Sequence, residues 1–142
     1  MKKVFVILGV ALTMFSCSDD DETFISAVNS NELVGRWTLV SQIEDNVVVN
    51  IDDCDRLSSV TFTESTVLFE NVSTNNAGEC IESEVDPFFD YTVENITITF
   101  TDSDGVSTEG SISIGGSNED IVQLNVELED GVDFQRSYRF DQ

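Results

Sequence analysis

Apolar and polar residues alternate over most of this chain, and the alternation runs from Leu33 to the last residue. A repeat of two residues is the pattern of strands that bury one face and expose the other. Turn-forming Asn, Asp, Gly and Ser residues separate the alternating runs, as expected between neighbouring antiparallel strands. No long stretch of this region keeps the apolar spacing of a helix. We therefore expect residues 33–142 to form an all-β domain.

The alternating runs predict eight principal strands joined by short connections. An open sheet of this size would expose two hydrogen-bonding edges, whereas closure of the sheet removes both. We therefore predict an eight-stranded antiparallel up-and-down barrel, with a flattened two-sheet sandwich as the alternative. In its first strand, Trp37, Leu39 and Ile43 are expected to share the inward face, because they have the same parity.

A different pattern occupies the first sixteen residues. Met1-Lys2-Lys3 is a short positive segment, and the apolar run 4–15 is too short to cross a bilayer but suits the h-region of a secretory signal. Ser16 and Cys17 end this run, an arrangement that resembles the lipobox of bacterial lipoproteins. The resemblance implies a signal peptide over residues 1–16 and a covalent lipid such as palmitate on Cys17. An ordinary cleaved signal peptide is the alternative.

Residues 17–32 are expected to form a tether outside the folded domain, with one helical turn over residues 24–28 that plugs a barrel end as the alternative for that segment. The acidic cluster Asp19–Glu22 follows Cys17 closely, and such polar, charged segments remain disordered. Ser18, rather than an aspartate, follows the cysteine, which resembles lipoproteins sent to the outer membrane of Gram-negative bacteria. The acidic cluster is similar to the export tag of surface-exposed lipoproteins. These resemblances imply an outer-membrane lipid anchor and leave periplasmic and surface exposure both open.

Three cysteines are present, and an odd number in an exported protein leaves one without a disulfide partner. A lipid on Cys17 accounts for the odd cysteine. Cys54 and Cys80 then remain beside predicted strands, in an oxidising compartment where a disulfide is the expected state. A redox-active pair is not favoured, because the two cysteines lie far apart in the sequence and have no C-x-x-C spacing.

The composition excludes several classes of function. With 28 acidic against 6 basic residues, the formal net charge is −22, and such a surface repels nucleic acid. The chain has no histidine and no lysine after residue 3. It therefore lacks the residues of Ser-His-Asp and Cys-His sites, of Schiff-base chemistry and of histidine-ligated metals. Paired carboxylates remain, but so many acidic residues form such pairs by chance, and we expect no enzymatic activity.

Two acidic loops are weak candidates for a metal site. The segment Asp102–Gly105 resembles the start of a calcium-binding loop, but the further ligands and the distant bidentate glutamate of that loop are absent. Its Asp-Gly end is equally the sequence of a hairpin turn. The second cluster is Asp52–Asp55. A solvated turn is the favoured interpretation of Asp102 and Asp104, so we predict no metal and no cofactor beyond the covalent lipid, with calcium as the alternative.

The segment Leu33-Val-Gly-Arg-Trp37 opens the first predicted strand, and a basic residue lies in the last. Together with eight meandering strands behind a lipoprotein signal, this resembles the lipocalin superfamily, and most closely the compact lipocalin-like domains of bacterial lipoproteins. The likeness covers residues 33–142, without the C-terminal helix of larger lipocalins, and the family tends to carry two cysteines at the places of the pair named above. The resemblance implies that Trp37 closes one barrel end beneath Arg136 in a cation–π contact. Arg139 is the alternative if a bulge shifts the parity.

The inward face of the barrel holds the candidate ligand-binding residues. An eight-stranded barrel is just wide enough either to be filled by side chains or to hold one small ligand. The resemblance implies a membrane-anchored, non-enzymatic protein that binds a small apolar or glycan ligand. A packed barrel that contacts an envelope protein, and a calcium-stabilised module, are the alternatives. The sequence leaves ligand, partner and oligomeric state open. The candidate ligand-facing residues are Phe62, Phe69, Phe89, Tyr91, Phe100, Phe134 and Tyr138.

Overall fold

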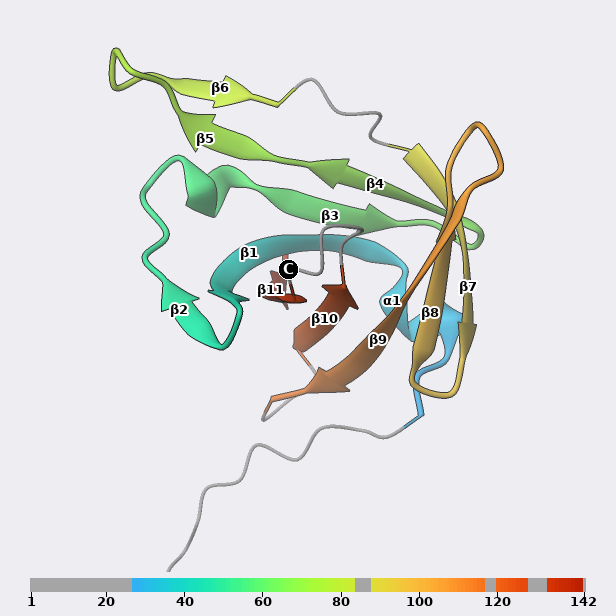
Figure 1. The fold of residues 1–142 in the computed structure, drawn as a ribbon. Helices are drawn as coiled ribbons and strands as arrows, with labels where there is room; N and C mark the ends of the chain where they lie inside the picture. Colours follow the sequence, from blue (N-terminus) through green and yellow to red (C-terminus); the bar gives the residue numbers. More distant parts are fainter. Residues whose placement is uncertain (1–26, 84–87, 117–119, 128–132, 142) are drawn as a thin grey trace, which may run out of the picture.

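The computed structural model describes residues 27–83, 88–116, 120–127 and 133–141, and it forms a barrel with a small hairpin beside it (Figure 1). Nine strands make one antiparallel sheet, and eight of them close into a ring because β11 pairs with β1. The predicted barrel is therefore confirmed. The eight strands of the ring are β1 (Gly35–Glu44), β3 (Ser59–Phe62), β4 (Thr66–Glu70), β7 (Phe88–Glu94), β8 (Thr97–Thr101), β9 (Ser107–Gly115), β10 (Ile121–Glu127) and β11 (Asp133–Phe140).

Three further strands lie outside this ring. β2 (Val47–Val49) pairs with the end of β1, after a turn in which Asp45 and Asn46 adopt positive φ angles of 47° and 64°. Such angles belong to the tight turns that suit the twist of a hairpin, and Asn and Asp tolerate them best among residues other than glycine. β5 (Val72–Thr74) and β6 (Cys80–Glu82) form a separate two-stranded sheet.

A disulfide joins this outer hairpin to the loop that precedes β3. Cys54 precedes the short 3₁₀ helix η1 (Asp55–Leu57), and Cys80 begins β6. The two Cα atoms lie 5.2 Å apart, and the bond between the sulfur atoms confirms the predicted pairing. Cys54 is buried, whereas Cys80 is exposed. The bond therefore clamps an element outside the ring onto the ring itself.

The short helix α1 (Ser30–Leu33) closes one end of the barrel and corrects the predicted boundary of the tether. Asn29 caps the helix in a capping box with Glu32. Val28 and Leu33 are buried in the core, and the Val28 N–H donates to the Asn95 carbonyl at 3.0 Å. The folded unit thus includes residues that we had assigned to the tether, because two apolar side chains among 27–33 fill the barrel end. Within the described residues, no helix has the length and apolar character needed to cross a membrane.

A bulge in β1 overturns the predicted inward position of Ile43. The pairing of β1 with β11 shifts between Leu39 and Ser41, so one additional residue enters β1 there. Beyond the shift, Gln42 lies opposite Arg136 and Ile43 lies opposite Gln135. An extra residue reverses the side-chain parity of the strand that follows it. Gln42 therefore takes the inward position that alternation alone had assigned to Ile43.

The core fills the half of the barrel next to α1. Trp37 is 2% exposed, and its indole N–H donates to the Leu33 carbonyl at 2.8 Å. The Trp37 ring also meets the edge of Phe140, with ring centroids 4.9 Å apart. Gly35 is required beside this contact, because its φ is +139° and a Cβ atom there would lie 2.4 Å from the Phe140 ring. The predicted closure of one barrel end by Trp37 is therefore confirmed.

Candidate ligand-binding site

The other half of the barrel contains a cavity of about 340 Å³. Its wall includes Phe134, which pairs with Glu44 at the end of β1 remote from α1. The volume is near the lower limit of small-molecule sites, roughly 300–1,000 Å³. Residues on β4, β7, β8, β9, β10 and β11, together with one residue directly after β4, line the cavity. They are Phe69, Asn71, Phe89, Phe100, Thr108, Leu124, Val126, Phe134, Arg136 and Tyr138.

Three phenylalanines form one aromatic wall of the cavity. Phe69, Phe89 and Phe100 contact one another edge to face, with centroid distances of 5.9, 5.5 and 6.3 Å. Each such contact adds roughly 0.5–1.5 kcal/mol beyond the burial of its area. Three rings that brace one another keep their rotamers, so this wall is preformed before any ligand enters.

Five of the seven predicted ligand-facing residues line the cavity, and two do not. Phe62 and Tyr91 instead pack against each other in the core, with ring centroids 5.2 Å apart. The Tyr91 hydroxyl donates to the Thr63 carbonyl at 2.8 Å, and burial raises the pKa of this hydroxyl. The two rings have the predicted inward parity, but they lie at the packed end of the barrel. Parity determines the face of a strand, whereas position along the barrel axis decides between core and cavity.

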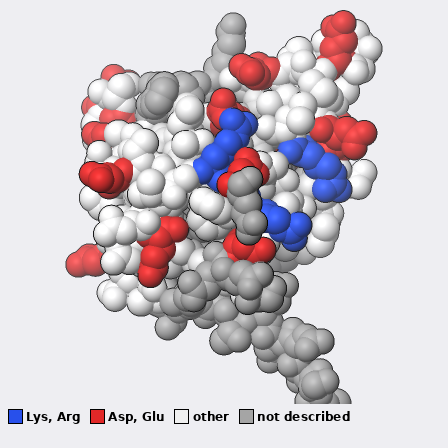
Figure 2. All heavy atoms as spheres, turned by 180° about the vertical axis from the view of Figure 1, so that it is seen from behind, with Lys and Arg blue, Asp and Glu red and all other residues white. Residues whose placement is uncertain are grey.

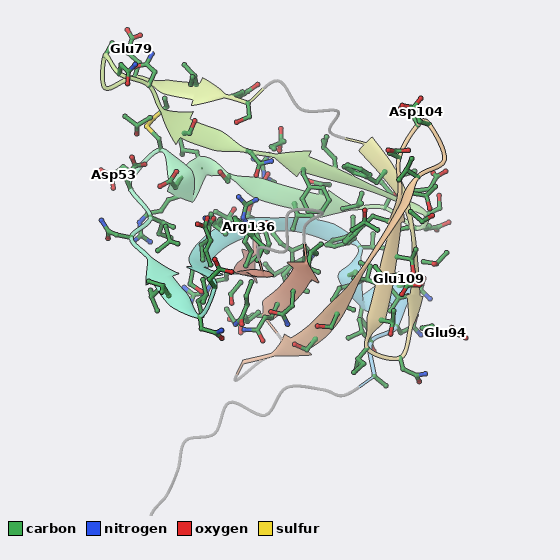
Figure 3. All side chains as sticks on the ribbon, viewed as in Figure 1. Asp53, Glu79, Glu94, Asp104, Glu109 and Arg136 are labelled. Atoms are coloured by element: carbon green, nitrogen blue, oxygen red, sulfur yellow. A yellow bond between two sulfur atoms is a disulfide. The ribbon has the colours of Figure 1, made fainter. Side chains whose placement is uncertain are left out.

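Of the described residues that line the cavity, only Arg136 is charged. Its Nε donates to Gln42 Oε1 at 3.0 Å, and its Nη1 donates to Asn71 Oδ1 at 2.6 Å. The guanidinium carbon lies 4.6 Å from the centre of the Phe134 ring. Figure 3 shows Arg136 inside the barrel, whereas the labelled acidic side chains lie around its outside. The inward direction predicted for Arg136 is confirmed.

The predicted contact between Arg136 and Trp37 is wrong. Trp37 lies opposite Phe140 in the β1–β11 pairing, whereas Arg136 lies opposite Gln42 near the other end of β1. Five residues of strand separate the two positions on β1, a span of roughly 16 Å. The alternative, Arg139, lies opposite Thr38 and is exposed. The ring that meets the indole is Phe140, so the closed end is sealed by aromatic packing instead of a cation.

Tyr138 lies beside Arg136 on the same inward face of β11. The side chain is 1% exposed, and this burial raises the pKa of its hydroxyl, against the opposing effect of the Arg136 charge and hydrogen bond. The hydroxyl of a buried tyrosine with a raised pKa stays protonated at neutral pH. Tyr138 therefore adds a second polar group to the cavity wall, next to the guanidinium.

The two amides that hold Arg136 were not predicted. Gln42 reaches the interior only because of the bulge in β1, and no signal in the sequence marks that bulge. Asn71 directly follows β4, where it accepts the Arg136 hydrogen bond. The apolar wall residues Leu124 and Val126 are different, because the alternating pattern of their segment already places both on one face.

On the outer surface, arginine is paired with carboxylates. Arg36 lies 3.3 Å from Glu70 and 3.5 Å from Asp141, and its side chain is 51% exposed. Figure 2 shows the positive side chains of this face gathered near its middle, with acidic side chains among and around them. Exposed pairs of this kind contribute little to stability, because water screens them. They do show that surface arginine charge meets acidic partners in this chain.

In each of the two acidic loops, an aspartate carboxylate accepts hydrogen bonds from backbone N–H groups of the same loop. Asp102 accepts hydrogen bonds from the N–H groups of Asp104 and Val106, at 2.9 and 2.8 Å, so its carboxylate organises the hairpin turn. Asp52 accepts from the Thr74 hydroxyl and from the N–H groups of Cys54 and Asp55, and these hydrogen bonds lower its pKa. Among the described residues, no three His, Cys, Asp or Glu side chains are grouped as metal ligands. The turn interpretation of Asp102 fits this geometry.

Cys17, the predicted lipidation site, and the predicted signal peptide 1–16 lie outside the described residues. A family model described as a lipocalin-like domain matches residues 33–135 of the chain. No curated protein matches the sequence. The matched range spans nearly the whole ring, from the last residue of α1 to the third residue of β11.

Proposed function

The chain belongs to the lipocalin-like domain family, and from this premise we propose that it is a lipid-anchored, non-enzymatic protein that binds one small, largely apolar ligand inside its barrel. The observation that carries the proposal is the cavity of about 340 Å³ in the half of the barrel that the core leaves unfilled. A cavity between the strands of an eight-stranded barrel is a place where one small ligand is held. The opposite half, with its packed indole, supplies the rigid base.

The cavity wall favours an apolar ligand over a glycan. Six of the ten lining side chains are Phe, Leu or Val, and the polar groups occupy only part of the wall. Sugar hydroxyls need hydrogen-bond partners around the whole ligand, since each buried polar group without a partner costs free energy. The volume corresponds to about eleven waters at roughly 30 Å³ each. The ligand is therefore compact.

A substitution that fills the cavity tests this proposal. Val126 lines the cavity on β10, and Gln123 lies on the opposite face of the same strand. We expect Val126→Trp to weaken binding of the apolar fluorophore N-phenylnaphthylamine by about tenfold or more, a loss of about 1.4 kcal/mol, because the indole occupies the ligand's volume. Gln123→Trp adds the same side chain to the outside and is expected to leave binding unchanged. Equal affinity of the two variants would show that the fluorophore binds elsewhere and that the cavity is not the site.

The anchoring part of the proposal is supported by the basic, apolar and small residues that precede Cys17 and by the odd cysteine count. It gives the protein an outer-membrane location in a Gram-negative cell. Metabolic labelling with an alkyne-bearing palmitate is expected to mark the full chain and not the Cys17→Ser variant, which should also leave the membrane fraction. Label retained by the Cys17→Ser variant would contradict the anchor. The absence of histidine throughout the chain supports the non-enzymatic role.

A further inference from the structure

Among the described residues, Arg136 is the charged residue that lines the cavity. In the described part of the chain, its hydrogen-bond partners Gln42 and Asn71 are neutral amides. A neutral oxygen orients a guanidinium but does not cancel its charge. Arg36, on the outer surface, instead lies within 3.5 Å of two carboxylates. Among the described residues of a chain with 28 acidic residues, no carboxylate forms an ion pair with Arg136, and the Glu44 carboxylate is joined to it only through the Gln42 amide.

The guanidinium still has hydrogen-bond donors for a ligand. Arginine carries five N–H donors, and the bonds to Gln42 and Asn71 use two of them. Beyond these two bonds, three donors remain for further acceptors. The Tyr138 hydroxyl lines the cavity with Arg136 and stays protonated, so it is a further donor. Arg136 and Tyr138 thus present donors to the same part of the cavity.

The contacts around Arg136 fix its orientation in advance. The Gln42 amide donates through Nε2 to Glu44 Oε1 at 2.7 Å, so its oxygen is turned towards Arg136. The Phe134 ring lies under the guanidinium at 4.6 Å. A cation that is already oriented and partly desolvated loses little entropy when an anion binds, and this strengthens the interaction.

We propose that the ligand is a compact anionic amphiphile whose oxyanion head binds Arg136 and Tyr138 while its apolar body lies against the phenylalanine wall. This inference rests on the proposed function and adds the charge of the ligand. The apolar side is formed by Phe69, Phe89 and Phe100, and the volume of about 340 Å³ limits the body to a short chain or a small ring system. Carboxylate is the head group that the planar fork of arginine matches most closely.

The role is distinct from the one that the family resemblance implies for an arginine of the last strand. That role is structural, over the tryptophan at the closed end. Here Phe140 packs against the Trp37 indole, and the indole N–H donates to the Leu33 carbonyl. Arg136 lies in the other half of the barrel. The cation is therefore not needed to close the barrel, and its contacts with the cavity remain available for ligand recognition.

Calorimetric titration with decanoate, 1-decanol and decylamine tests the proposal, because the three probes share one apolar chain and differ in head group. The full chain carries Cys17→Ser so that no acyl chain competes for the cavity. We expect decanoate to bind about 10-fold to 100-fold more tightly than 1-decanol, as for a charge-assisted hydrogen bond, and decylamine to bind most weakly. Equal binding of decanoate and 1-decanol would overturn this inference and leave the proposed function standing. Binding of none of the three would overturn the proposed function itself.

Two variants test whether Arg136 causes the tighter binding of decanoate than of 1-decanol. Arg136→Met is expected to remove it, so that decanoate and 1-decanol bind equally. Arg139→Met makes the same change of net charge at an exposed position of the same strand and is expected to keep the preference. A preference for decanoate that persists in a folded Arg136→Met protein would overturn the assignment of Arg136. Circular dichroism checks the fold of each variant, and the comparison of probes on the unsubstituted barrel stands even where a variant does not fold.

Discussion

Replacing Trp37 with alanine is expected to lower the free energy of unfolding by about 3–5 kcal/mol, the usual cost of removing a fully buried indole. The side chain is 2% exposed and meets Phe140 edge to face. Its loss leaves a cavity beneath α1 and deprives the Leu33 carbonyl of the indole N–H that donates to it. Small domains have a total stability of about 5–15 kcal/mol. The variant should therefore lose a large share of its stability and unfold at a clearly lower urea concentration.

Urea denaturation of three proteins separates packing from hydrogen bonding at this position. Trp37→Phe keeps most of the apolar area and removes the indole donor, so its loss is expected to lie between those of the parent and Trp37→Ala. Val106→Ala truncates a side chain that is 55% exposed and serves as the control, with a change within about 0.5 kcal/mol. If Trp37→Ala cost less than about 1 kcal/mol, the indole would not be the element that seals this end.

The barrel could be predicted because its signals are local and repeated. The alternation that begins at Leu33 fixes which residues of each strand face inward, and the turn residues fix where each strand ends. Cys54 and Cys80 could be paired because they are the two cysteines left after Cys17 is assigned to the lipid. These features need no knowledge of how distant strands are aligned. A period of two residues, read along the chain, is sufficient.

The environment of Arg136 could not be predicted, because it depends on register between distant strands. A single extra residue in β1 places Gln42 inside the barrel and turns Ile43 away. That residue leaves no mark in an alternating sequence, since either parity contains apolar side chains. The sequence also does not show how far along the barrel axis an inward-facing residue lies. Trp37 and Arg136 both point inward, yet one lies in the packed half and the other in the cavity.

The boundary of the domain illustrates a related limit. Val28 lies in a segment rich in polar and acidic residues, and composition assigns such a segment to a tether. The structure buries Val28 and Leu33 because the open end of the barrel offers an apolar surface that short apolar segments can cover. Whether an isolated apolar residue is buried depends on a surface formed by strands far away in the sequence. Local composition therefore underestimates its burial.

Removing the disulfide is expected to have the second large effect. The double variant Cys54→Ser/Cys80→Ser opens a loop of 26 residues, and the chain-entropy estimate for a loop of this length is a loss of roughly 3–4 kcal/mol. The bond lies between η1 and β6, outside the ring of eight strands. The variant is therefore expected to keep the barrel, with unchanged strand content by circular dichroism, while its urea midpoint falls.

Reduction of the parent protein separates the effect of breaking the disulfide from any effect of the serine substitutions on packing. Reduction is expected to lower the urea midpoint of the parent protein towards that of the double variant and to leave the double variant unchanged. Cys17→Ser, which removes a cysteine outside the described residues, is the matched control and should unfold as the parent does. A parent midpoint that does not respond to full reduction would contradict the prediction.

Reduction is also expected to weaken binding of decanoate more than binding of 1-decanol. Asn71 precedes β5 and accepts a hydrogen bond from Arg136, and reduction removes the disulfide that holds the β5–β6 hairpin in place.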